Sequence, residues 1–147
     1  MAWLTKADPG MKLGCQWTDR TCPVVEKATC WLSRVVYEVK CSLCEAKYIG
    51  TTGLTMHARG LQHVEALLNG DTSYPLTKHY LQAHPGVVVD RGSISMAPLS
   101  GHQPDNVRRY IAEAVAISKA TGKGATLLNS KGEWSRVKIK RLAITED

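Results

Sequence analysis

Hydrophobic and polar residues alternate along residues 35–40, and this period of two predicts a β-strand with two differently used faces. A second extended run follows at residues 48–50, and the turn between the two runs holds Cys41 and Cys44. Residues 51–53 end the second run before a helical pattern begins. The segment is therefore expected to form a hairpin of two short strands.

Three later stretches show the spacing of amphipathic helices. In residues 54–68 one stripe is apolar, and it consists of Leu54, Ala58, Leu61, Val64 and Leu68. Residues 75–83 begin with a proline, which suits a first helical turn. Residues 104–120 form the third helix, in which Glu113 borders a predicted buried stripe of Val107, Ile111, Ala114, Val115 and Ser118. Residues 87–89 and 94–96 look extended, as either a hairpin or one bulged strand.

These elements predict an α/β fold in which a small, mainly antiparallel three-stranded sheet is flanked by helices. Residues 1–29 are expected to be a lead-in segment, residues 30–130 the main domain, and residues 131–147 a basic tail or strand. In that last segment one side is basic and consists of Arg136, Lys138 and Lys140. This side either faces nucleic-acid phosphates or is simply solvated.

Composition narrows the class of partner. The chain has 147 residues and a formal net charge of +6, which favours a polyanion such as nucleic acid. No apolar run reaches the roughly 20 residues that a membrane span needs, and the first ten residues lack the apolar core of a signal peptide. The sequence therefore predicts a soluble, intracellular protein with no membrane partner, in which cysteines are free or metal-bound.

Two pairs of residues have the spacing of a zinc site. Cys41 and Cys44 form a CxxC pair, and His79 and His84 follow with four residues between them. The gap between the pairs is longer than in a DNA-reading zinc finger, so the expected site is a structural clamp that joins the hairpin turn to the second helix. The alternative is two surface histidines and two buried thiols.

Other candidate ligands leave further alternatives open. Cys15, Cys22 and Cys30 are separated by six and seven residues, which matches no tight metal-binding turn. They are either thiols in a partly buried loop or ligands of a second zinc ion. His57 and His63 could substitute for one of the histidines of the clamp, although their positions on a helix suit other roles.

With these residues in order, the chain resembles the GIY-YIG endonucleases. Residues 35–37, Val-Val-Tyr, stand where that family has Gly-Ile-Tyr, and residues 48–50 are an unaltered Tyr-Ile-Gly. The family's helical Arg and His match Arg59 and His63, its metal-binding glutamate matches Glu113, and its terminal Leu-Asn matches a pair that ends in Asn129. The resemblance covers residues 35–129. Three departures are Val35 for Gly, Gln62 for Glu, and Leu54 for Arg.

Within that family, the CxxC between the tyrosines and the later histidine pair look most like the endonuclease domain of Penelope-like retroelements. The resemblance implies a nuclear enzyme that nicks target DNA and leaves a 3′-hydroxyl to prime reverse transcription. It further implies a reverse transcriptase on the same polyprotein and the element RNA as partners. Two alternatives remain: a zinc-stabilised nucleic-acid-binding module with little activity, and a host-type repair or homing nuclease.

The chemistry of phosphodiester cleavage suits these residue types. A lone carboxylate, Glu113, can hold a Mg²⁺ or Mn²⁺ ion that keeps most of its waters, and Arg59 can contact the same phosphate through two hydrogen bonds. The resemblance implies that Tyr37 is the general base. Tyr48 and His63 are expected to orient water or phosphate, and Asn129 is expected to brace the site.

Overall fold

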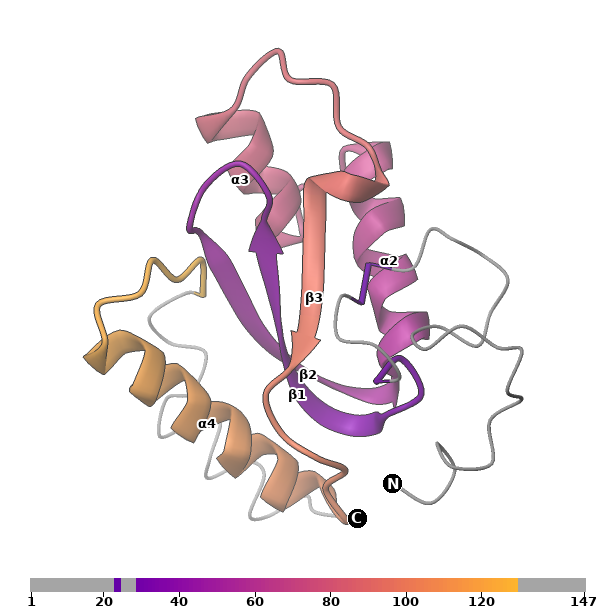
Figure 1. Cartoon of the computed structure of the whole chain (residues 1–147), viewed down its shortest axis with the longest axis vertical. Helices are drawn as coiled ribbons and strands as arrows, with labels where there is room; N and C mark the ends of the chain where they lie inside the picture. Colours follow the sequence, from indigo (N-terminus) through magenta and orange to yellow (C-terminus); the bar gives the residue numbers. More distant parts are fainter. Residues whose placement is uncertain (1–22, 25–28, 130–147) are drawn as a thin grey trace.

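The computed structural model describes residues 23–24 and 29–129 (Figure 1). The elements run in the order β1 (Ser33–Cys41), β2 (Lys47–Thr55), α2 (Met56–Asn69), α3 (Pro75–Ala83), the short 3-10 helix η1 (Arg91–Ser93), β3 (Ile94–Pro98) and α4 (Asn106–Gly122). The described residues confirm a small α/β fold with a three-stranded antiparallel sheet and helices. The predicted basic side, Arg136, Lys138 and Lys140, lies outside the described residues, as do Cys15 and Cys22.

The strand β1 is the centre of the sheet. Strand order is β2-β1-β3, and β1 pairs antiparallel with both neighbours. In the first pair Tyr37 is opposite Gly50 and Val39 is opposite Tyr48. Residues opposite each other in such a ladder share one face, so the two tyrosines lie on the same side of the sheet.

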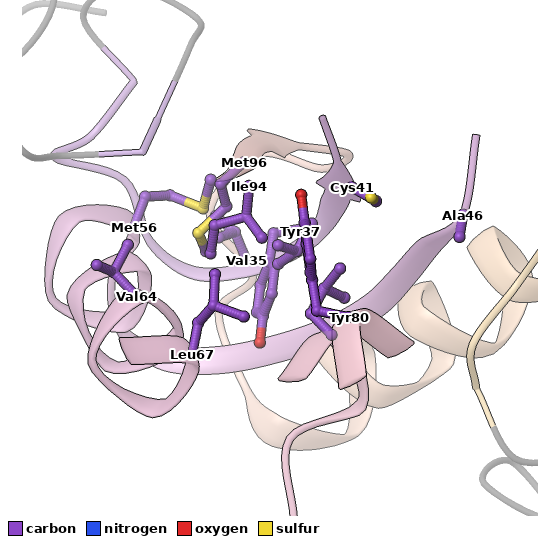
Figure 2. Close-up of a cluster of buried hydrophobic side chains, with 12 residues drawn as sticks. Val35, Tyr37, Cys41, Ala46, Met56, Val64, Leu67, Tyr80, Ile94 and Met96 are labelled. Carbon is purple, nitrogen blue, oxygen red and sulfur yellow. The ribbon is translucent and has the colours of Figure 1, made fainter. Parts of the chain in front are cut away.

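Helices cover both faces of the sheet. Figure 1 shows α2 and α3 on one side and α4 across the other. The first side holds the larger buried cluster, which joins Val35, Tyr37 and Val39 of β1 to apolar residues of α2, α3 and β3 (Figure 2). The second side holds a smaller cluster made of Val36, Ile49, Ile117 and Ala120. Alternation along β1 thus assigns successive valines to opposite layers, as a strand with two buried faces requires.

The helix ends follow local chemistry. Thr55 caps α2 by accepting a hydrogen bond from the backbone N–H of Ala58, so this helix begins two residues later than the sequence predicts. Gly70 ends α2 with φ 71°, in the left-handed region that glycine enters without strain. Pro75 occupies the first turn of α3, and Asp105 caps α4.

The predicted buried faces of two helices are wrong. Of the apolar stripe predicted for the first helix, Leu54 lies in β2 and is exposed, Leu68 of α2 is exposed, and Val64 is buried. The residues of α2 that are buried are Met56, His57, Gly60, His63, Val64, Ala66 and Leu67. In α4 the buried residues are Arg109, Glu113, Ile117 and Ala120, whereas Ile111 and Val115 are exposed. Both helices therefore bury a face that carries polar side chains.

The third strand matches neither predicted arrangement, because β3 (Ile94–Pro98) includes only the second of the two extended runs. Residues 87–89 form no strand, and β3 begins only after η1. Asp90 explains the break, because its side chain accepts a hydrogen bond from the backbone N–H of Gly92 and Ser93 closes the capping box. From the lead-in segment, the Pro23 carbonyl accepts a hydrogen bond from the backbone N–H of Met96, and Val24 forms an isolated β-bridge with Met96. Residues 23–24 therefore lie beside β3. Among the described residues, no helix combines the length and the apolar character needed to cross a membrane.

Candidate functional site

A hydrogen-bonded group of three predicted site residues joins β1 to α2. The Arg59 Nε–H donates to the Tyr37 hydroxyl oxygen at 3.0 Å, and the same hydroxyl lies 2.9 Å from Nε2 of His63. Arg59 and His63 are one helical turn apart, so they reach the tyrosine from the same face of α2. The structure therefore brings Tyr37, Arg59 and His63 together, although they are up to 26 residues apart.

The glycine of the Tyr-Ile-Gly motif makes room for both tyrosines. A Cβ atom on Gly50 would lie 2.7 Å from the Tyr37 hydroxyl oxygen and 2.8 Å from the ring of Tyr48. Side chains do not tolerate contacts this short, and Tyr37 is fully buried and cannot move outward. Here glycine is needed for close approach of two rings rather than for a special backbone angle.

Gly50→Ala is expected to lower the free energy of unfolding by about 1–3 kcal/mol, because the added methyl group overpacks the site. Chemical denaturation would measure the loss. Gly101→Ala is the matched control, since a Cβ at Gly101 meets no atom within 4 Å. Equal stability of the two variants would contradict the close packing of Gly50 against Tyr37 and Tyr48.

Tyr74 is a site residue that the sequence analysis missed. The Arg59 guanidinium carbon lies 5.5 Å from the centre of its ring, and the His63 ring meets it edge to face at 5.2 Å. Both contacts fix the positions of charged or polar groups that also touch Tyr37. The one available signal is its place directly before Pro75, at the N-cap position of α3.

The surroundings of Tyr37 disfavour the role of general base at neutral pH. Burial raises the pKa of Tyr37 above its usual value of 10. The Arg59 guanidinium opposes this shift, and the negative charge of Glu113 adds to it. The general-base role stays a prediction, and burial together with the raised pKa favours a positioning role for this hydroxyl.

His63 is held in its neutral form. Its side chain is 2% exposed, and burial together with the Arg59 charge lowers its pKa to about 3. Because Tyr37 accepts a hydrogen bond from Arg59, its own proton is free to be donated to Nε2 of His63. That arrangement places the imidazole proton on Nδ1, which has no hydrogen-bond partner among the described residues.

This pKa predicts a pH-dependent stability. An unfolded histidine gains a proton below about pH 6.5, whereas folded His63 does so only near 3, so acid favours the unfolded chain. The stability that neutral His63 contributes is present above 6.5 and is lost as pH falls toward 3. Relative to His63→Gln, the parent protein should lose about 2 kcal/mol between pH 7 and pH 5. Parallel pH dependence in urea unfolding of both proteins would refute this assignment.

Glu113 reaches the site from the opposite side of the sheet. It lies on the buried face of α4, is 3% exposed, and is close enough to Tyr37 for its charge to raise that pKa. Arg109, one turn earlier, is also buried, and its NH1 nitrogen is 3.4 Å from the place where a Cβ of Gly53 would stand. A buried cation one turn before a buried carboxylate reduces the cost of burying either group.

Asn129 holds the second tyrosine strand in place. Its side-chain oxygen accepts from the backbone N–H of Ile49 at 2.9 Å, and its side-chain nitrogen donates to the Ile49 carbonyl at 2.7 Å. Ile49 lies between Tyr48 and Gly50, and Tyr48 is partly buried against the larger cluster. The contact stabilises the edge strand directly beside the two tyrosines.

The second candidate site is a cluster of Cys41, Cys44, His79 and His84. One ligand atom from each lies within 4.8 Å of the others; Cys44 Sγ is 3.2 Å from His79 Nε2, and Cys41 Sγ is 3.6 Å from His84 Nε2. Around tetrahedral zinc, sulfur and nitrogen ligands lie about 3.5 Å apart. The four side chains thus have the donor types and the spacing to hold a metal ion such as zinc.

Two elements and one turn hold this cluster. Cys41 ends β1, Cys44 lies in the turn between β1 and β2, His79 lies in α3, and His84 is the residue that ends α3. Tyr80 packs against both histidine rings, and its hydroxyl donates to the Ser93 carbonyl, which ties α3 to η1. Figure 2 shows the hydroxyl end of Tyr80 beside Cys41. His57 and His63, considered as substitutes, are buried in α2 and are not members of the cluster.

Cys30 bears on the alternative of a second zinc site. Its side chain is 1% exposed. The other two cysteines of that alternative, Cys15 and Cys22, lie outside the described residues, so both readings of this trio stay open.

Comparisons with known proteins add no family assignment. No protein-family model, no curated protein and no solved structure matches the chain.

Proposed function

We propose that this protein is a metal-dependent DNA endonuclease. The observation that supports this best is the group formed by Tyr37, Arg59 and His63 with the charge of Glu113 acting on it. These residues come from β1, α2 and α4, and the resemblance to GIY-YIG endonucleases assigns a role to each of them. A structural cluster would need neither the arginine nor the carboxylate, which are costly to bury.

In the proposed reaction a water molecule attacks the scissile phosphorus and the bond to the 3′-oxygen breaks. The proton of the attacking water passes to solvent, and solvent water returns one proton to the leaving 3′-oxygen. Arg59, partly exposed beside Tyr74, contacts the phosphate and neutralises developing charge. Tyr48, partly buried on the edge strand, would orient the attacking water. Tyr37 and His63 position Arg59.

Glu113 is the proposed ligand of a catalytic Mg²⁺ or Mn²⁺. Among the described residues, Cys41, Cys44, His79 and His84 are the one group of three or more metal-ligating side chains. A single carboxylate fits Mg²⁺, which commonly takes one or two carboxylates from the protein and further oxygens from substrate phosphates. When bound, such an ion neutralises phosphate charge and makes a coordinated water more acidic.

The Cys2His2 cluster is proposed to bind a structural Zn²⁺. It fixes the turn between β1 and β2 against α3, and so holds the strands that carry Tyr37 and Tyr48. Four protein ligands leave no open coordination position, which is typical of structural rather than catalytic zinc.

The biological role proposed for the enzyme follows from the resemblance to Penelope-like retroelements. The enzyme would act in the nucleus and nick double-stranded target DNA, and the free 3′-hydroxyl would prime reverse transcription of the element RNA. The reverse transcriptase would belong to the same polyprotein. The lysines and arginines that give the chain its net charge of +6 would favour binding to the DNA backbone.

The direct test of this function is conversion of supercoiled plasmid to open circles with Mg²⁺ or Mn²⁺. We expect nicking that EDTA abolishes, and nicked ends that a DNA polymerase extends without prior treatment. DNA binding is measured in parallel by gel shift. Binding without nicking under every metal condition would refute the endonuclease and support a zinc-stabilised binding module.

That binding module is the second candidate function, and the burial of the site favours it. Tyr37 is 0% exposed, His63 2% and Glu113 3%, so bound DNA must open a path to them. The other alternative, a host-type repair or homing nuclease, shares the proposed chemistry but not the Cys2His2 cluster within the fold.

A further inference from the structure

The helix α4 turns apolar side chains away from the sheet. Ile111 is 55% exposed and Val115 is 46% exposed, and the two share one face because they are four residues apart. The buried face of the same helix carries Arg109 and Glu113. An amphipathic helix at a surface ordinarily turns its polar face outward, so the exposed apolar pair marks the outer face of α4 as a candidate contact surface.

A hollow lies beside this face, between α4 and the sheet. Its volume is about 400 Å³. Its apolar lining includes Val36, Ile49, Leu99, Ala112, Val115 and Ala116. Leu99 is 44% exposed, and its backbone N–H donates to the Val36 carbonyl, which fixes the backbone of Leu99 at the edge of the hollow. We call the hollow together with Ile111 the α4 groove.

The charges of the α4 groove are mainly positive. Lys47, Lys119 and Lys123 line it, and the last two are exposed and one helical turn apart. Its one carboxylate, Glu38, is already paired with Lys47 at 3.2 Å and with Lys40 at 3.7 Å. Lys119 and Lys123 therefore remain the dominant charges for an incoming ligand.

We propose that the α4 groove docks an acidic, amphipathic helix of another polypeptide. Apolar side chains of that helix would fill the hollow and cover Ile111 and Val115, and its carboxylates would pair with Lys119 and Lys123. Such a complementary arrangement speeds association and excludes basic partners. A second copy of this chain is the poorer occupant, because its own groove would bring lysines toward lysines.

The test uses two synthetic peptides of about 14 residues, roughly four helical turns. One consists of leucine, alanine and glutamate in an amphipathic pattern, and the other has lysine in place of every glutamate. Nuclear magnetic resonance of the full chain labelled with nitrogen-15 follows each titration. We expect the glutamate peptide to shift the amides of Leu99, Ile111, Val115 and Lys119, and the lysine peptide to bind at least tenfold more weakly.

Two variants make the assignment specific. Val115→Ser should weaken binding of the glutamate peptide at least tenfold. The double variant Lys119→Glu with Lys123→Glu should bind the lysine peptide more tightly than the glutamate peptide. All three changed residues are exposed, so the fold is expected to survive, and unchanged melting checks this.

Several outcomes overturn the proposal. They are no binding, equal binding of both peptides, and shifts that map away from α4. If sedimentation shows that the parent chain dimerises and that Val115→Ser abolishes the dimer, the occupant of the α4 groove is a second copy of the chain. Because none of these readouts involves nicking, the inference stands or falls separately from the nuclease.

Discussion

Cys44→Ser is expected to abolish zinc binding and to unfold the chain at ordinary temperature. A structural zinc site contributes on the order of 10 kcal/mol to folding, which rivals the total stability of a typical domain. Cys44 is exposed, so the exchange of sulfur for oxygen leaves no cavity, and the effect reports on the metal. Zinc analysis by mass spectrometry and thermal melting of parent and variant measure the two parts of this prediction.

The control for the zinc prediction is Cys30→Ala. Cys30 is buried but does not belong to the cluster of Cys41, Cys44, His79 and His84, so its variant should keep the zinc of that cluster. A chelator should lower the melting temperature of the parent and of Cys30→Ala alike. If Cys44→Ser binds as much zinc as the parent and melts at the same temperature, the cluster holds no structural ion.

Arg59→Lys is expected to reduce nicking by about 100-fold or more with little change in DNA binding. Arginine supplies a planar fork of donors: the Nε–H of Arg59 donates to the Tyr37 hydroxyl, and its NH1 nitrogen donates to the side-chain oxygen of Gln62. Lysine keeps the charge but cannot make both contacts at once. The rate of plasmid nicking at saturating protein isolates the chemical effect from affinity.

Arg108→Lys is the matched control for that experiment. Arg108 is exposed on α4 and pairs with Asp105 at 3.6 Å, away from Tyr37. The Arg108→Lys variant should nick DNA at the parent rate. Both variants should have the melting temperature of the parent protein. Loss of activity in both variants, or in neither, would contradict the role assigned to Arg59.

Local patterns in the sequence predicted the parts of the fold that depend on local chemistry. Period-two alternation located β1, Pro75 located the start of α3, and Gly70 located the end of α2. The CxxC and the histidine pair predicted a four-residue cluster, and the structure confirms that the four side chains meet.

Which face of a helix is buried depends on the whole fold, and the sequence did not predict it. Counting apolar residues favoured the stripe that includes Ile111 and Val115 in α4, yet Ile117 and Ala120 pack on the sheet and rotate Glu113 inward. In α2, Gly60 allows close approach, since a Cβ there would lie 2.8 Å from Pro23. Each helix thereby buries one polar residue assigned to the site, His63 in α2 and Glu113 in α4.

Contacts between distant segments also escaped the sequence analysis. Tyr74 touches Arg59 and His63 only because the loop after α2 folds back along that helix. The capping box at Asp90 is a local motif. The start of β3 at Ile94 depends in addition on a distant contact, the pairing of Ile94 with Cys41 of β1. The protonation of His63 likewise follows from burial, which no motif encodes.

One measurement tests the proposed catalytic centre most directly: nicking of supercoiled plasmid by the parent and by Glu113→Gln at equal DNA occupancy. The glutamine variant keeps the size of the side chain but removes the charge that would hold Mg²⁺ or Mn²⁺ and that acts on Tyr37. We predict metal-dependent nicking by the parent and a loss of at least about 100-fold in the variant. Equal nicking by both proteins would contradict the assignment of Glu113, and with it the proposed centre.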